Sequence, residues 1–364
     1  MNGKAAIFTD VGKPLEFRDY PLPEVEPGAM LVKISMANIC GSDLHFLKGQ
    51  GPGVPRGIPQ ILGHEMTGHV ARLGREVKTD SLGQPLREGD RVVYAYFRGC
   101  GTCWMCLEGQ PGCPNRYAHW IGVSSDNPPH FNGAYAEYYY LRPGQWVFKV
   151  PDELPDTLVS PVNCALAEVI YGLHRTGITL GDSVVIQGAG GLGLYATAVA
   201  REMGAGQIIV LDRVKDRLDL AKAFGADHVF NVDEVDWPQR LEAIRELTSG
   251  RGADVVAEFV GSPSVVQEGV EMLRYGGRYL WIGNINLGLK GEIDPGQVVR
   301  GSRTVFGLVV YEAWVIPRAL QFLQRTRTKY PYERIISHTF PLERINEAFE
   351  QAYQRRVMRV SLVP

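Results

Sequence analysis

The stretch SVVIQGAGGLGLYATAVAREMGAGQIIVLD, residues 183–212, decides the fold of this 364-residue chain. Its apolar start, residues 183–187, predicts a buried strand, and residues 194–203 predict a helix. Residues 207–211 predict a second strand, which ends at Asp212. A strand, a glycine-rich turn and a helix leading to a second strand indicate a βαβ unit with parallel strands.

The turn inside this stretch, residues 188–193, reads G-x-G-x-x-G, and an acid follows 19 residues after Gly193. Such glycines let the backbone approach a pyrophosphate held at a helix N-terminus, so we expect a dinucleotide site. Asp212 would accept hydrogen bonds from the adenosine ribose and repel a 2′-phosphate, which favours NAD over NADP. Arg213 beside it weakens that preference slightly. Strands predicted at 253–259 and 277–283 extend the unit into a Rossmann doubly wound parallel sheet.

Composition excludes several classes of protein. The formal net charge is −2, from 38 basic and 40 acidic residues, and no block of like charge stands out. This argues against nucleic-acid partners and against a membrane partner. The first ten residues meet Asp10 too early for a signal-peptide core, and the apolar run 184–200 is interrupted by four glycines. We therefore expect a cytoplasmic protein.

Six cysteines point to metal rather than to disulfides, because the chain is long and carries no export signal. Four of them, Cys100, Cys103, Cys106 and Cys113, fall within fourteen residues. Four thiolates at this spacing predict a closed tetrahedral zinc site, which is a structural site. A zinc ribbon that binds nucleic acid is the alternative, but the flanking residues lack the basic and aromatic surface that it would need.

A second metal site is predicted from residues that lie far apart in the chain. Cys40 and His64 lie beside predicted strands, and Cys164 would complete three protein ligands with one open position, as catalytic zinc requires. Glu65 and Glu168 compete with Cys164 for the third place. Short apolar runs between Gly and Pro turns predict that residues 1 to about 95 form a mainly β, partly barrel-like unit.

Taken together, these motifs resemble one family over nearly the whole chain: the zinc-dependent medium-chain alcohol dehydrogenases. The resemblance is carried by residues 40–45 (CGSDLH), residues 63–65 (GHE) with Gly68, the four-cysteine lobe, Cys164, and the glycine turn with Asp212. It implies a GroES-like catalytic domain and the ligands Cys40, His64 and Cys164 for catalytic zinc.

The resemblance also implies roles for the neighbouring residues. Glu65 would lie beside the zinc and could join it transiently, and Asp43 would orient the zinc-binding histidine. The proton of a zinc-bound alcohol would leave through Ser42 and the nicotinamide ribose to His45, and the resulting alkoxide would pass hydride to NAD. Arg217 would reach the adenosine ribose. The implied cofactor-binding residues are Gly188, Gly190, Leu192, Gly193, Asp212, Arg213, Arg217, Val260, Gly283 and Arg359, the last at the pyrophosphate.

The chain departs from the family pattern in the spacing of the four lobe cysteines. The fourth cysteine usually comes eight residues after the third, whereas Cys113 comes seven after Cys106, so the loop must be tighter. Residues 161–167 and the aromatic segment 117–146 resemble a branch compared with 5-exo-hydroxycamphor, threonine and polyol dehydrogenases.

The predicted organisation is a catalytic domain at 1–165 with a zinc lobe at 98–115, an NAD-binding domain at 166–305, and a return to the catalytic domain at 306–364. Two zinc ions per chain, a cleft between the domains and a homo-oligomer, either dimer or tetramer, are expected. A non-catalytic nucleotide-binding scaffold is the alternative outside enzymes.

The substrate is expected to be a small alcohol. Phe46 and Tyr96 would border the pocket and favour a bulky apolar secondary alcohol, alicyclic or bicyclic and terpene-like, which is oxidised to the ketone. A threonine or polyol dehydrogenase is the alternative, in which His119, His130 or Glu168 would contact a polar substrate.

Overall fold

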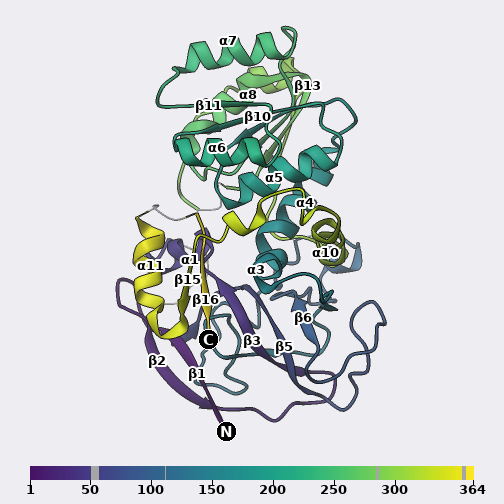
Figure 1. Cartoon of the computed structure of the whole chain (residues 1–364), viewed down its shortest axis with the longest axis vertical. Coiled ribbons are helices and arrows are strands. Elements are labelled where there is room, and N and C mark those ends of the chain that lie inside the picture. The colour runs from purple at the N-terminus through teal and green to yellow at the C-terminus, as the bar shows by residue number, and fades with distance from the viewer. Residues whose placement is uncertain (51–56, 111, 284–286, 355–357) are drawn as a thin grey trace. The chain divides into compact units, whose positions relative to one another are not determined.

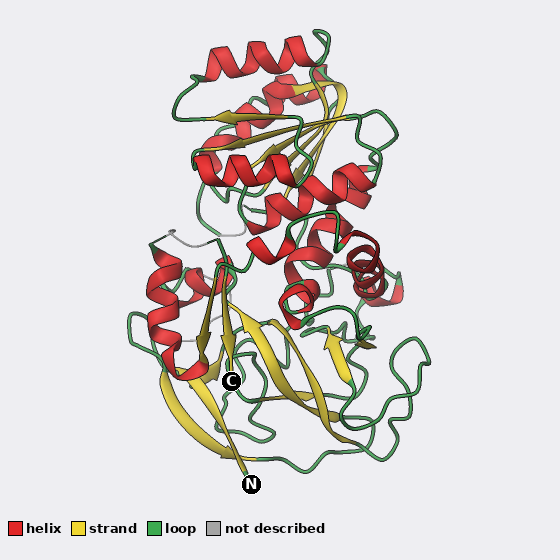
Figure 2. Cartoon of the chain, viewed as in Figure 1, coloured by secondary structure: helices red, strands yellow, loops and turns green. Residues whose placement is uncertain are grey.

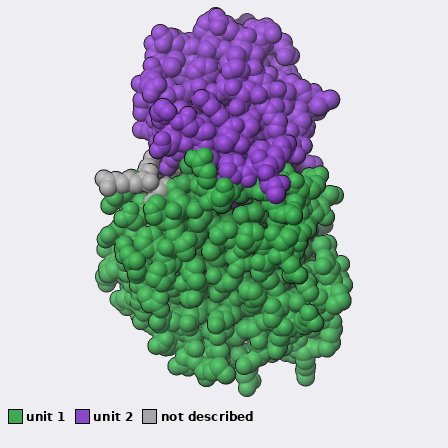
Figure 3. Space-filling view, viewed as in Figure 1, with its two compact units in different colours: residues 1–167, 312–327, 332–364 green, residues 168–311, 328–331 purple. Residues whose placement is uncertain are grey.

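The computed structural model describes residues 1–50, 57–110, 112–283, 287–354 and 358–364, so residue 111 of the predicted lobe lies outside the described part. The chain divides into two compact units (Figure 3). Unit 1 contains residues 1–167, 312–327 and 332–364, and unit 2 contains residues 168–311 and 328–331. Within the described ranges, none of the helices combines the length and apolar character of a membrane span.

Unit 2 is built on a parallel sheet of six strands in the order β11-β10-β9-β12-β13-β14 (Figures 1 and 2). The strands are β9 (Ser183–Gln187), β10 (Gln207–Asp212), β11 (His228–Asn231), β12 (Ala253–Glu258), β13 (Leu273–Trp281) and β14 (Thr304–Gly307). The helices are α4 (Ala167–Thr176), which starts in unit 1, α5 (Gly191–Glu202), α6 (Lys215–Ala223), α7 (Trp237–Leu247), α8 (Val266–Met272) and α9 (Pro295–Arg300). This strand order is that of a Rossmann doubly wound sheet, so the predicted fold is confirmed.

The glycine turn enters its helix earlier than predicted. Helix α5 begins at Gly191 rather than at residue 194, so the last glycine of the motif lies inside the first helical turn. A Cβ on Gly193 would lie 1.8 Å from the carbonyl oxygen of Gly188. Only glycine therefore lets the helix pack this closely on the turn, and the sequence prediction of the helix start was wrong because this first turn is rich in glycine.

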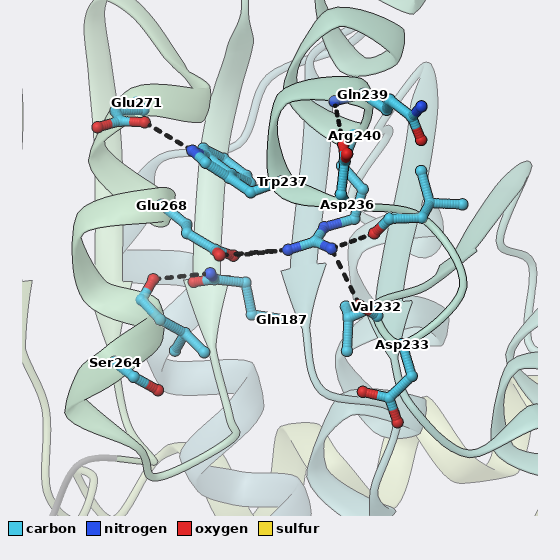
Figure 4. A network of polar contacts seen from close by, with 12 residues as sticks. Gln187, Val232, Asp233, Asp236, Trp237, Gln239, Arg240, Ser264, Glu268 and Glu271 are labelled. Carbon is cyan, nitrogen blue, oxygen red and sulfur yellow. Dashed lines mark hydrogen bonds and ion pairs between the residues drawn. The ribbon is translucent and has the colours of Figure 1, made fainter.

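A polar network around the buried side chain of Arg240 joins elements of unit 2 (Figure 4). The guanidinium of Arg240, on α7, donates to both carboxylate oxygens of Glu268, on α8, at 3.2 and 3.3 Å. The same guanidinium donates to the backbone oxygens of Val232 and Val235 in the segment that follows β11. One side chain thus joins two helices and the end of an edge strand.

Unit 1 is mainly β, as predicted. A three-stranded antiparallel sheet contains β1 (Asn2–Phe8), β2 (Glu16–Pro21) and β4 (Gln60–Ile61). A seven-stranded sheet contains β3 (Met30–Asn38), β5 (Glu65–Leu73), β6 (Arg91–Tyr94), β7 (Tyr138–Leu141), β8 (Val147–Lys149), β15 (His338–Pro341) and β16 (Val360–Val363).

The helical segments of unit 1 are short apart from two near its C-terminus. They are α1 (Gly41–Leu47), α2 (Trp104–Leu107), α3 (Asp156–Val159), a π-helix η1 (Val162–Leu166), α10 (Val315–Thr326) and α11 (Ile345–Tyr353). Single 3₁₀ turns occupy η2 (Pro263–Val265) in unit 2 and η3 (Tyr332–Arg334) and η4 (Leu342–Arg344) in unit 1.

The pairing of β3 with β5 brings the predicted zinc ligands Cys40 and His64 to one end of the sheet. The two strands are antiparallel, and Asn38 at the end of β3 is opposite Glu65 at the start of β5. Residues just after β3 and just before β5 therefore meet at the same end of the sheet. Cys40 is two residues beyond Asn38, and His64 directly precedes Glu65.

Candidate metal and active site

Four donor side chains gather at this end of the sheet in unit 1. Cys40, His64, Glu65 and Cys164 each contribute one ligand atom, and these atoms lie within 4.8 Å of one another. The other acid considered for the third place, Glu168, instead accepts a hydrogen bond from the backbone N–H of Val310 in unit 2 at 2.9 Å. The structure thus brings Cys164, and not Glu168, to Cys40 and His64.

A helix start holds Cys40 in place. Cys40 is the N-cap residue of α1, and its backbone N–H donates to Oδ2 of Asp43 at 2.9 Å. An acid at the third helical position that reaches back to the N-cap is one half of a capping box, and this signal was present in the sequence. The other oxygen of Asp43 lies 3.5 Å from Nδ1 of His64. Asp43 thereby contacts one candidate ligand and lies beside another.

Cys164 lies in a local distortion that periodicity could not predict. It sits in the π-helix η1, where helical periodicity had been expected only after it. Single-turn π segments are rare and are frequently found at functional sites. The buried Asn163 next to it donates to the backbone oxygen of Tyr94 at 2.8 Å and accepts from the backbone N–H of Met66 at 3.3 Å. Strands β5 and β6 therefore fix the turn that presents Cys164.

The electrostatics of the cluster suit a cation. The fully buried Glu65 pairs with the guanidinium of Arg359, and burial raises the pKa of Glu65 to about 7 against the opposing effect of Arg359. Contact with Cys164, and then with His64, holds the pKa of the Cys40 thiol well below its usual range. Oε1 of Glu65 and Nδ1 of His64 are buried and make no hydrogen bond within the described residues. Two thiols, an imidazole and an unpaired carboxylate oxygen fit a zinc ion.

The two residues predicted to carry a proton lie on α1. Ser42 and His45 are both partly exposed, in contrast to the buried Asp43 between them. Nδ1 of His45 lies 3.1 Å from Oε1 of Gln50. Arg359, for which a pyrophosphate contact was implied, is buried in unit 1 against Glu65, and its role toward a cofactor stays a prediction.

An aromatic wall lies against the candidate ligand His64. The ring of Tyr96 lies 4.8 Å from the His64 ring between centroids, and the ring of Trp120 lies 5.1 Å from it. Trp120 also contacts Tyr96 at 4.9 Å, Phe46 at 6.3 Å and Tyr117 at 5.6 Å. The sequence predicts Phe46 and Tyr96 at the pocket, whereas nothing in the sequence distinguishes Trp120 from the other aromatic residues between 117 and 146.

The histidines considered for a polar substrate lie in other settings. His130 stacks on Tyr20 with centroids 4.8 Å apart, and its Nδ1 lies 2.8 Å from the backbone oxygen of Ser125. His119 is exposed, and partial burial together with Arg142 and Arg98 lowers its pKa.

The four cysteines of the lobe form a second cluster in unit 1. Sγ atoms of Cys100, Cys103, Cys106 and Cys113 lie within 4.8 Å of one another, and all are free thiols. The shorter spacing before Cys113 therefore does not prevent the four from meeting. The backbone N–H of Thr102, then its hydroxyl and the amide of Asn115, lower the pKa of Cys100 to about 5. Donors aimed at sulfur stabilise a thiolate, which is the form that binds metal.

In unit 2, the predicted dinucleotide turn is present with its acid beside it. Oδ2 of Asp212 accepts from the backbone N–H of Ala189 at 2.7 Å, and Oδ1 accepts from that of Val214 at 2.8 Å. The carboxylate therefore ties the end of β10 to the glycine turn.

The remaining cofactor candidates lie at or near the carboxyl ends of strands in unit 2. Arg213 is exposed, and its guanidinium lies 3.8 Å from a carboxylate oxygen of Asp233. Arg217 is partly exposed on α6, and Leu192 is partly exposed in the first turn of α5. Val260 is 46% exposed just after β12. Gly283 donates to the backbone oxygen of Glu258, and a Cβ there would lie 2.6 Å from the backbone nitrogen of Gly261.

Known protein families match parts of both units. Residues 26–152 match the alcohol dehydrogenase GroES-like domain, and residues 191–325 match the zinc-binding dehydrogenase domain. The 5-exo-hydroxycamphor dehydrogenase of Pseudomonas putida is 30% identical over 350 residues, which cover 95% of this chain and 94% of that protein. The chain belongs to the zinc-dependent medium-chain alcohol dehydrogenase family.

Other relatives in this alcohol dehydrogenase family are equally similar. The sorbitol dehydrogenase of Bacillus subtilis is 31% identical, with 97% of this chain and 94% of the relative covered. The L-threonine 3-dehydrogenase of Bacillus licheniformis is 30% identical, with coverages of 99% and 98%. Among solved structures, an alcohol dehydrogenase of Thermotoga maritima is 31% identical with a TM-score of 0.94, and the whole of each chain is covered. The benzyl alcohol dehydrogenase of Acinetobacter calcoaceticus is 27% identical with a TM-score of 0.86, and 100% of this chain and 99% of that chain are covered.

Proposed function

We propose that this alcohol dehydrogenase oxidises a bulky apolar secondary alcohol to the ketone, with zinc and NAD as cofactors. The observation that carries the choice of substrate is the aromatic wall of Tyr96, Trp120 and Phe46 beside His64. All three side chains are buried, and they offer apolar rings beside the residue expected to hold the metal. A wall of this kind favours an apolar ring system over a polyol.

Cys40, His64 and Cys164 would hold the catalytic zinc, with Glu65 beside it and Asp43 orienting His64. A zinc ion bound there acts as a Lewis acid and lowers the pKa of a hydroxyl group that it binds. The lobe cysteines would hold a second, structural zinc. A non-catalytic scaffold would retain only that second ion, so metal analysis of the purified protein distinguishes the two: about two zinc ions per chain would support the enzyme, and one would support the scaffold.

Ser42 and His45 are the residues that would move the proton of the alcohol. A hydroxyl both accepts and donates a hydrogen bond, and an imidazole can take up a proton at one ring nitrogen and release one from the other, so the pair suits proton transfer toward solvent. His45→Gln should lower turnover mainly at low pH, and added buffer should restore part of it. An unchanged pH profile would remove His45 from this role.

The deciding experiment is NADH formation with a panel of alcohols. Bicyclic and alicyclic secondary alcohols are compared with benzyl alcohol, threonine, sorbitol and short primary alcohols, with NADP in parallel. The relatives named for hydroxycamphor and for benzyl alcohol motivate the apolar group, and those named for threonine and sorbitol motivate the polar group. Preference for apolar alcohols supports the proposal, whereas preference for threonine or sorbitol overturns the substrate assignment.

A further inference from the structure

Tyr135 is a fully buried tyrosine whose hydroxyl contacts Asp43, the acid that lies beside the ligand cluster. Its Oη donates to Oδ2 of Asp43 at 2.7 Å, the same oxygen that accepts the backbone N–H of Cys40. Asp43 is also fully buried, and its other oxygen lies 3.5 Å from Nδ1 of His64. One carboxylate therefore lies between two candidate ligands, and Tyr135 supplies one of the hydrogen bonds that hold it.

The backbone of the same segment binds residues 62 and 63, which lead into the candidate ligand His64. The N–H of Tyr135 donates to the oxygen of Leu62 at 3.1 Å, and the N–H of Ala134 donates to the oxygen of Gly63 at 3.0 Å. The Tyr135 ring covers Gly63, whose φ is +83° and where a Cβ would lie 2.7 Å from the ring. Residue 135 is thus bonded to the segment leading into His64 through its backbone and to the segment after Cys40 through its side chain.

We propose that Tyr135 is a positioning residue for the catalytic metal: its hydroxyl fixes Asp43, and through Asp43 it fixes Cys40 and His64. The proposal rests on the proposed function of the cluster as a zinc site. A buried carboxylate keeps one orientation only while donors hold its oxygens. Without the hydroxyl, Oδ2 of Asp43 loses the hydrogen bond from Tyr135 and still accepts the one from the Cys40 N–H. The carboxylate can then turn away from His64.

The chain offers a matched control. Tyr94 is fully buried in unit 1 like Tyr135, but within the described residues its hydroxyl makes no hydrogen bond. Tyr135→Phe and Tyr94→Phe each remove one buried hydroxyl and retain the ring. Only the first removes a contact to Asp43, so a difference between them reports on that contact and not on the loss of an oxygen atom.

The test is the rate at which zinc-loaded full-length protein loses each metal to a chromogenic chelator, together with the visible spectrum of the cobalt-substituted protein. Removing a hydrogen-bond partner of a metal ligand typically lowers metal affinity 10- to 100-fold, and Tyr135 acts on the ligands through Asp43, so Tyr135→Phe should release one metal about 10-fold faster. Its cobalt spectrum should shift, because the spectrum reports the ligand geometry. The lobe metal and the Tyr94→Phe protein should keep the rates of the unmodified protein.

Three outcomes would decide against the proposal or its basis. Release rates within twofold of the unmodified protein, with an unchanged cobalt spectrum, overturn the role of Tyr135. Apoprotein of Tyr135→Phe that fails to fold, or melts far below apo Tyr94→Phe, assigns the hydroxyl to folding and also overturns it. Unmodified protein that binds metal only at the lobe removes the zinc site itself and with it the proposed function.

Discussion

The indole of Trp120 lies against the imidazole of His64, with 5.1 Å between ring centroids. Trp120 is only 5% exposed, so the contact is part of a packed wall and not of a loose loop. Trp120→Ala should lower kcat/KM for a bicyclic alcohol by about 10-fold or more, mainly through KM, because apolar contact with the substrate is lost. Steady-state kinetics with bicyclic and short alcohols check this, and the short alcohols should change less.

A second tryptophan provides the control for that experiment. Trp104 on α2 is 64% exposed in the lobe, so Trp104→Ala removes the same atoms from the surface. Its kinetics should match those of the unmodified protein. An equal fall in kcat/KM in both variants, or no fall in Trp120→Ala, would show that the aromatic wall does not determine which alcohol is oxidised.

The lobe should act on stability and not on selectivity. Sγ of Cys103 lies 3.8 Å from Sγ of Cys113, within the proposed structural zinc site. Cys103→Ser should reduce the zinc content by about one ion per chain, since one ligand is lost. If the free energy of unfolding of Cys103→Ser falls by about 2 kcal/mol, Tm should fall by ~4–8 °C in a domain of this size. Metal analysis and thermal unfolding, again with Trp104→Ala as control, measure both, and full zinc content in Cys103→Ser would contradict the assignment.

Apolar periodicity and motif spacing in the sequence predicted the strands on either side of the glycine turn. Strands β9 and β10 lie where the apolar runs placed them, because both are fully or largely buried and their residues have no alternative polar face. The short helix α1 was missed, although Asp43 three residues after Cys40 was a capping signal.

Other features depend on contacts between distant segments. The π-turn at Cys164 is held by contacts from Asn163 to β5 and β6, which no local pattern contains. For the same reason, the run of aromatic residues between 117 and 146 did not distinguish Trp120, at the His64 ring, from Tyr135, beneath Asp43.

Asp212 should control the choice between NAD and NADP. Its carboxylate accepts two backbone N–H groups from the glycine turn and from Val214, so Asp212→Gly would also disturb the turn. Asp212→Asn removes the charge and retains one acceptor oxygen. Without the negative charge a 2′-phosphate is repelled less, and the ratio of kcat/KM for NADP to that for NAD should rise about 10-fold or more. An unchanged ratio would place cofactor choice on other residues.

Removing one partner of the ion pair between Arg240 and Glu268 should destabilise unit 2 (Figure 4). The Arg240 side chain is 6% exposed and that of Glu268 is 26% exposed. Arg240→Met leaves a partly buried carboxylate without its partner and removes two hydrogen bonds to the segment after β11, which should cost about 2–4 kcal/mol. Urea unfolding measures this. Arg245→Met, an exposed position on the same helix, should stay within about 0.5 kcal/mol of the unmodified protein.

Adding Glu268→Gln to Arg240→Met should recover part of that loss, because a neutral amide is less costly to leave without a partner than a carboxylate. Burial already raises the pKa of Glu268 while Arg240 lowers it, so the pKa should rise further in Arg240→Met alone. A carboxyl with a raised pKa in the folded state contributes stability below its unfolded pKa that is lost as the pH rises. The destabilisation of Arg240→Met should therefore be smaller at pH 5 than at pH 8, and equal losses at both values would show that the lost backbone contacts, and not the charge, carry the effect.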